Sequence, residues 1–168
     1  MANKAFQPTP RTARLKASVG QTFTQQVSQT EGDMMVDDGA KRDFGCERCW
    51  PSTADAAWEA RGALIHVQDL IDESHFHVMI LACPRCTQPF VSVFTETIDW
   101  QDGDDPQYWT LLPITETEAV DLVQERNSLT ETKLDALGRG RRCLRRDHPK
   151  GAVPRIFWGT GISVGLHD

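Results

Sequence analysis

Two pairs of cysteines, each separated by two residues, are the part of the chain best suited to chemistry. They are Cys46 and Cys49 in FGCERCWP, and Cys83 and Cys86 in LACPRCTQPF. A C-x-x-C turn aims two sulfurs at one ion, so two such turns supply the four thiolates of a tetrahedral Zn²⁺ site. Catalytic zinc keeps an open position for water, whereas four cysteines close the shell. The sequence therefore predicts one structural Zn²⁺ ion, with iron as the less favoured metal.

Two other uses of these thiols compete with metal binding. A thioredoxin-like redox motif needs one C-x-x-C that opens a helix, and does not need two pairs. Two disulfides require an oxidising compartment, whereas no secretory signal opens the chain and the fifth cysteine is left over. We therefore expect a cytoplasmic protein. Redox or metal sensing, through loss of the metal on oxidation, is kept as an alternative function.

The second cysteine pair resembles the zinc knuckles of zinc-ribbon and rubredoxin-like proteins. In those knuckles a strand leads into C-P-x-C, and an aromatic residue precedes the next strand. The resemblance covers Cys83 to Phe90 well and Cys46 to Trp50 more loosely, and it does not extend to the rest of the chain. Those knuckles usually carry glycine after the second cysteine, where this chain has Thr87 and Trp50. The resemblance implies a zinc-ribbon-like core.

The composition is typical of one soluble domain with a tail. Of the 168 residues, 39% are hydrophobic and 25% are charged, which is sufficient for a modest core. No apolar run approaches the roughly 18 residues of a transmembrane helix, so no membrane partner is expected. Residues 1–44 are polar and rich in turn formers, which predicts a flexible, disordered tail followed by a zinc-binding domain at 45–168.

The hydrophobic pattern predicts an α+β fold, with a small antiparallel sheet and one or two helices. HFHVMILAC and PFVSVFTETIDW predict two strands that pair as a hairpin around the second knuckle, and YWTLLPI predicts a third. The last stretch, from residue 142 onward, also has β character. Apolar residues at helical spacing favour a helix over residues 53–72, although ALIHV is equally compatible with a strand. That stripe consists of Ala56, Ala60, Leu64, Val67 and Ile71.

A second helical region covers residues 115–137. Thr115 and Glu118 are spaced as a capping box at its start. The segment RNSLTE divides it in two if Ser128 caps a second helix, and Gly138 ends it.

Five arginines between residues 139 and 146 form a candidate site for an anion, a nucleic acid or a protein partner. Arginine is suited to bidentate phosphate contacts, and the neighbouring Phe157 and Trp158 would add stacking. Alternatively, these arginines pair with acidic residues in the centre of the chain. The whole chain has a net charge of −6. On a strand, the side chains at 142 and 146 face away from those at 143 and 145. The five are Arg139, Arg141, Arg142, Arg145 and Arg146.

An enzyme on a zinc-stabilised scaffold is the alternative to a binding protein. His75 and His77 share a face if they lie on a strand, and the loop Asp99–Asp105 gathers four acids. A cleft lined by these groups would support acid–base chemistry. The chain lacks the H-E-x-x-H and H-x-E signatures of zinc hydrolases, so we favour a non-enzymatic binding or adaptor module.

Overall fold

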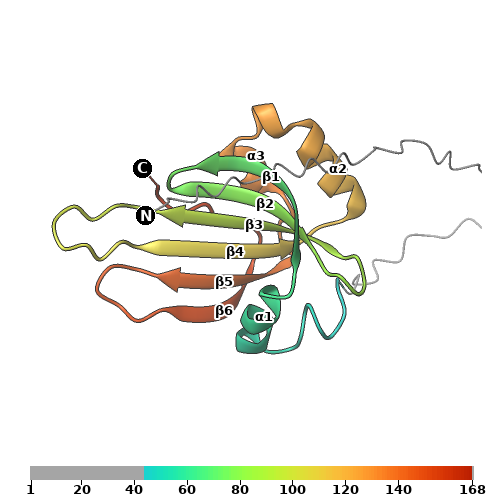
Figure 1. Cartoon of the computed structure of the whole chain (residues 1–168), viewed down its shortest axis with the longest axis horizontal. Helices are drawn as coiled ribbons and strands as arrows, with labels where there is room; N and C mark the ends of the chain where they lie inside the picture. Colours follow the sequence, from blue (N-terminus) through green and yellow to red (C-terminus); the bar gives the residue numbers. More distant parts are fainter. Residues whose placement is uncertain (1–43, 168) are drawn as a thin grey trace, which may run out of the picture. The chain divides into compact units, whose positions relative to one another are not determined.

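The computed structural model describes residues 44–167, which form a six-stranded antiparallel sheet with three α-helices and one 3₁₀ helix. Figure 1 shows the strands side by side in chain order, each joined to the next. The strands are β1 (Ile65–Glu73), β2 (Phe76–Ala82), β3 (Pro89–Glu96), β4 (Gln107–Pro113), β5 (Arg142–His148) and β6 (Arg155–Thr160). The helices are α1 (Ala54–Arg61), α2 (Glu116–Gln124), η1 (Arg126–Ser128) and α3 (Glu131–Ala136).

The α+β class is confirmed, but the sheet is larger and the helices are more numerous than expected. The predicted hairpin around the second knuckle is present, with β2 and β3 in register from Phe76–Thr95 to Ala82–Pro89. Except for Phe44, the tail predicted for residues 1–44 lies outside the described residues. None of the helices in the described part of the chain is long and apolar enough to cross a membrane.

The single helix predicted for residues 53–72 is wrong. Thr53 caps α1, which ends at Arg61. The N–H groups of residues 62, 63 and 64 then each donate to the carbonyl three residues earlier, which tightens the backbone and ends the helix. From Ile65 the chain pairs with β2 as an edge strand, with irregularities in register on either side of Gln68. The apolar residues keep a helical spacing as far as Ile71, but the backbone is helical only through α1. Beyond it the β-branched residues are stabilised by pairing across strands, which local periodicity does not reveal.

The second helical region follows the sequence prediction at its start and departs from it at its centre. Thr115 accepts a hydrogen bond from the N–H of Glu118, whose carboxylate accepts one from the N–H of Thr115, so the capping box is present. The region divides in two as expected, but Ser128 lies in η1 and Thr130 caps α3 instead. Either hydroxyl suits an N-cap, and the backbone after η1 becomes extended only at Leu129 and Thr130.

The sheet has a separate apolar cluster on each face. On one face, here called the helix face, α2 and α3 insert Leu122 and Leu134 among residues of β1 to β5. The opposite face, here called the knuckle face, packs against α1 and both cysteine pairs. The buried apolar sheet residues of the helix face include Val78, Val91, Leu112 and Cys143, and those of the knuckle face are Leu81, Phe90, Leu111 and Leu144.

Candidate metal centre

The second knuckle is the turn between β2 and β3. The N–H of Cys83 donates to the carbonyl of Gln88, and the N–H of Thr87 donates to that of Cys83, both at 3.0 Å. Thr87 has a φ of 58°, the left-handed conformation in which knuckles usually carry glycine. The hydroxyl of Thr87 donates to the carbonyl of Cys86 at 2.7 Å. The turn therefore forms without the glycine.

The first knuckle is a separate turn that packs onto the sheet through its tryptophan. The N–H groups of Cys49 and Trp50 both donate to the carbonyl of Cys46, at 3.0 and 2.8 Å. The Trp50 ring lies 5.4 Å from that of Phe90, which is fully buried on β3. A large aromatic contact of this kind fixes the knuckle to the knuckle face, beside the start of β3.

The four cysteine sulfurs form one compact group. All four Sγ atoms lie within 4.8 Å of one another, and Cys49 Sγ lies 3.7 Å from both Cys46 Sγ and Cys86 Sγ. A tetrahedral Zn²⁺ with bonds of about 2.3 Å places its sulfurs about 3.8 Å apart. A disulfide would bring two sulfurs to about 2.05 Å, and all four cysteines are free thiols. The predicted clustering of Cys46, Cys49, Cys83 and Cys86 is confirmed at metal-binding distance.

Each knuckle stabilises the thiolate of its first cysteine. The N–H groups of Cys49 and Arg48 lower the pKa of Cys46 to about 6. Burial opposes ionisation of Cys83, but the N–H groups of Cys86 and Arg85 outweigh it, so its pKa is lowered too. Burial raises the pKa of the second cysteine in each pair, Cys49 and Cys86. Four thiolates this close would repel one another, so full ionisation requires a cation among them.

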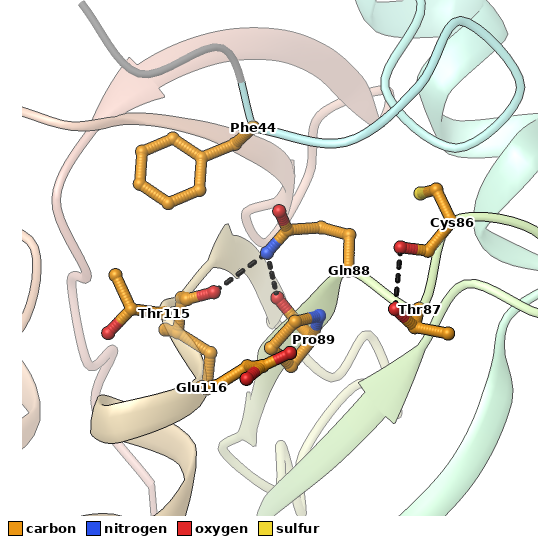
Figure 2. A pocket seen from close by; sticks show the side chains of 8 residues that line it. Phe44, Cys86, Thr87, Gln88, Pro89, Thr115 and Glu116 are labelled. Carbon is orange, nitrogen blue, oxygen red and sulfur yellow. Dashed lines mark hydrogen bonds between the residues drawn. The ribbon is translucent and has the colours of Figure 1, made fainter. Parts of the chain in front are cut away.

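Gln88 joins both knuckles to the far end of β4. Its amide donates to the carbonyls of Pro89 and Ile114, both at 2.7 Å, and its side-chain oxygen accepts from the N–H of Gly45 at 3.2 Å. Figure 2 shows this side chain at the centre of a hollow beside Cys86, with Phe44 and Glu116 on its walls. Sequence reasoning missed Gln88, because only its position two residues after Cys86 links it to the site.

Gly45 leaves room for the first knuckle, and alanine there is expected to weaken metal binding. Gly45 has a φ of +79°, and an added Cβ would lie 2.9 Å from Cys49 Sγ and 3.0 Å from Trp50 Cβ. Gly103 is a matched control, because its φ is +67° and an added Cβ would meet nothing within 4 Å. Both substitutions incur about 1–2 kcal/mol of backbone strain. We expect only Gly45→Ala to lower metal affinity in a chelator competition titration, and equal affinities would contradict this account of the knuckle.

The five arginines of residues 139–146 do not form one basic patch. Arg141 makes a bidentate ion pair with Glu118, at 2.8 and 3.0 Å, and Arg139 and Arg145 donate to backbone carbonyls. Arg142 and Arg146 lie on the knuckle face over tryptophan rings, away from Cys143 as the strand pattern predicted. The alternative of pairing with acidic residues therefore holds for Arg141.

The residues of the enzyme hypothesis contact separate polar partners. His75 lies 3.2 Å from Glu96, and His77 lies 3.0 Å from Asp72. Lys150 contacts Asp99 and Asp102 at 2.6 and 2.8 Å, and its hydrogen bond lowers the pKa of Asp99. The acidic loop is thus tied to the β5–β6 turn.

No family model matches the chain, and no curated protein or solved structure matches it either.

Proposed function

We propose that the four cysteines bind one structural Zn²⁺ ion and that the protein is a zinc-stabilised binding module. The observation that carries the metal proposal is the compact group of sulfurs, whose closest separations match the edges of a zinc tetrahedron. The likeness of this protein to a zinc ribbon is limited to the two knuckles and the hairpin formed by β2 and β3.

Zinc is preferred over iron for two reasons. Zinc has no geometric preference of its own, so it accepts the arrangement set by two independent turns. Rubredoxin-like iron knuckles favour glycine after the second cysteine, whereas this chain has Trp50 and Thr87 at those positions. Four thiolates also leave no position for a water molecule, which favours a structural role over a catalytic one.

Binding is preferred over catalysis because the candidate catalytic groups have partners of their own. His75 and His77 each contact a different carboxylate, and Asp99 contacts Lys150. By contrast, the knuckle face carries aromatic rings and arginines that are only partly buried, which suits contact with another molecule.

Metal analysis tests the proposal directly. Full-length protein is purified without added zinc or chelator, and its metals are measured by inductively coupled plasma mass spectrometry. We expect one zinc per chain and a colourless protein. Iron with visible thiolate absorption would overturn the choice of zinc, and a metal-free protein with two disulfides would overturn the site itself.

A further inference from the structure

A groove on the helix face lies between α2 and the first half of β1, and aliphatic side chains form most of its lining. Val67 of β1, Ile80 of β2 and three apolar residues of α2 line it. Ile65 borders it, because it pairs with Ala82, which also lines the groove. Of the seven large apolar side chains that are exposed in residues 44–167, four gather here. They are Ile65, Val67, Val120 and Val123, each between 39% and 54% exposed.

The side of α2 that lines this groove has an ordered charge pattern. Glu116, Val120, Val123 and Arg126 are separated by four, three and three residues, the spacing of one helical stripe. Glu116 lines the groove at the start of α2, and Arg126 is exposed in η1, directly after its end. Ala119 lines the groove beside the valines. This set is called the α2 stripe.

Both charges of the α2 stripe lack a partner within the chain. In residues 44–167 no oppositely charged group lies within 4.0 Å of Glu116 or Arg126. By contrast, Glu118 forms an ion pair with Arg141, and Glu125 forms one with Lys133. A negative end, an apolar centre and a positive end are therefore all available to a second molecule.

We propose that two copies of this chain associate through the α2 stripe, with their α2 helices antiparallel across a two-fold axis. A symmetric contact requires a surface that is complementary to itself. The midpoint of residues 116 and 126 is Asp121, and the midpoint of Val120 and Val123 lies within one residue of it. Antiparallel helices therefore place Glu116 against Arg126 of the second copy at each end, while the valines of both copies meet between these two ion pairs.

Other occupants use less of what this surface offers. Strand addition at β1 is disfavoured, because the register with β2 shifts at Val67 and Leu70, and Asp69 and Asp72 place charge along this edge. A small aliphatic ligand would fill the groove but would leave the charges of the α2 stripe unpaired. A helix of another protein would need the same order of charges in reverse, which a second copy of this chain already carries.

Sedimentation equilibrium of the full-length protein tests the association. One short helix and one strand edge form a small interface, so we expect a dissociation constant on the order of 10–100 μM. The measured mass should rise from that of one chain, 18.9 kDa, to twice that value between about 1 μM and about 1 mM. Val120→Lys places a charge at the centre of the stripe and should abolish this rise. Val153→Lys is the matched control, because Val153 is 79% exposed outside the groove and should associate like the unaltered chain.

Charge exchange tests the antiparallel arrangement specifically. Glu116→Arg and Arg126→Glu each bring like charges together at both ends of the contact, so each should weaken self-association roughly tenfold or more. The first variant carries two cations on its stripe and the second carries two anions, so an equimolar mixture should form a heterodimer about as tightly as the unaltered chain associates. Asp121→Arg makes the same change of charge on α2 but off the stripe, and it should leave association unchanged.

Each contrary result overturns a stated part of the proposal. A single-chain mass throughout the concentration range overturns the association. A mixture that associates no better than its two components overturns the antiparallel pairing, and loss of folding in either variant could not produce the expected rescue. Equal weakening by the control variants overturns the assignment to the α2 stripe.

This inference goes beyond the proposed function and does not depend on the metal. Zinc content is therefore measured on every variant. A chain that holds one zinc but stays monomeric refutes the dimer alone, and a dimer without zinc refutes the metal proposal alone.

Discussion

Removing the metal is expected to unfold the end of the sheet that carries the knuckles. Zinc binding in small zinc-folded peptides contributes about 10–16 kcal/mol near neutral pH, and a whole domain is stable by only about 5–15 kcal/mol. The first knuckle depends on the metal most, because it joins the sheet mainly through Trp50 and the metal itself. We expect chelation or Cys49→Ser to lower the unfolding free energy by roughly 5 kcal/mol or more.

Thermal unfolding and hydrogen exchange measure this effect and locate it. The expected fall in Tm is about 15 °C or more. Amides of residues 46–50 and 83–88 should lose protection first, while those under α2 and α3 on the helix face keep theirs. Cys143→Ala is the matched control, because Cys143 is a buried thiol that lies on the helix face and outside the sulfur group. Unchanged near-UV circular dichroism and exchange after metal stripping would refute the structural role.

Phe90→Ala is expected to have the second-largest effect. Phe90 is fully buried between the first knuckle and the sheet, and its ring contacts Trp50. Replacing such a ring with alanine leaves a cavity and costs about 3–5 kcal/mol. Because the cavity lies under Trp50, the first knuckle loses its apolar contact, so metal affinity should fall together with stability.

Phe94→Ala provides the comparison, since Phe94 is the same residue type on the same strand and face. Its ring is partly exposed near the end of β3 away from the knuckles, so less apolar surface is lost and surrounding water fills the space. We expect a cost of about 1–2 kcal/mol with no change in zinc affinity. Denaturant unfolding and a chelator titration on both variants check this difference. Equal losses of stability would mean that Phe90 does not support the knuckle.

The features that were predictable from the sequence depend on contacts close together in the chain. Two residues between cysteines suffice to aim two sulfurs at one ion, so both knuckles are recognisable without the fold. The hairpin of β2 and β3 follows because the second knuckle joins two apolar segments. The capping box of Thr115 and Glu118 is likewise completed within one helical turn.

The features that were mispredicted depend on neighbours distant in the chain. Val67 and Ile71 lie at helical spacing from α1, yet pairing with β2 makes them part of an edge strand. The five arginines look equivalent in sequence. Only the fold brings Glu118 to Arg141 and tryptophan rings to Arg142 and Arg146. Strand alternation separated their faces correctly but could not identify those partners.

The sequence alone thus determined which residues can hold a metal, because four cysteines in two tight turns define a ligand set by local geometry. The tertiary structure alone decided which residues of separate segments meet across the sheet. Phe94, Trp109 and Arg146 belong to three separate segments, and no spacing along the chain relates them. Pairing of β3, β4 and β5 in one register brings them side by side, because antiparallel partners project their side chains from the same face of a sheet.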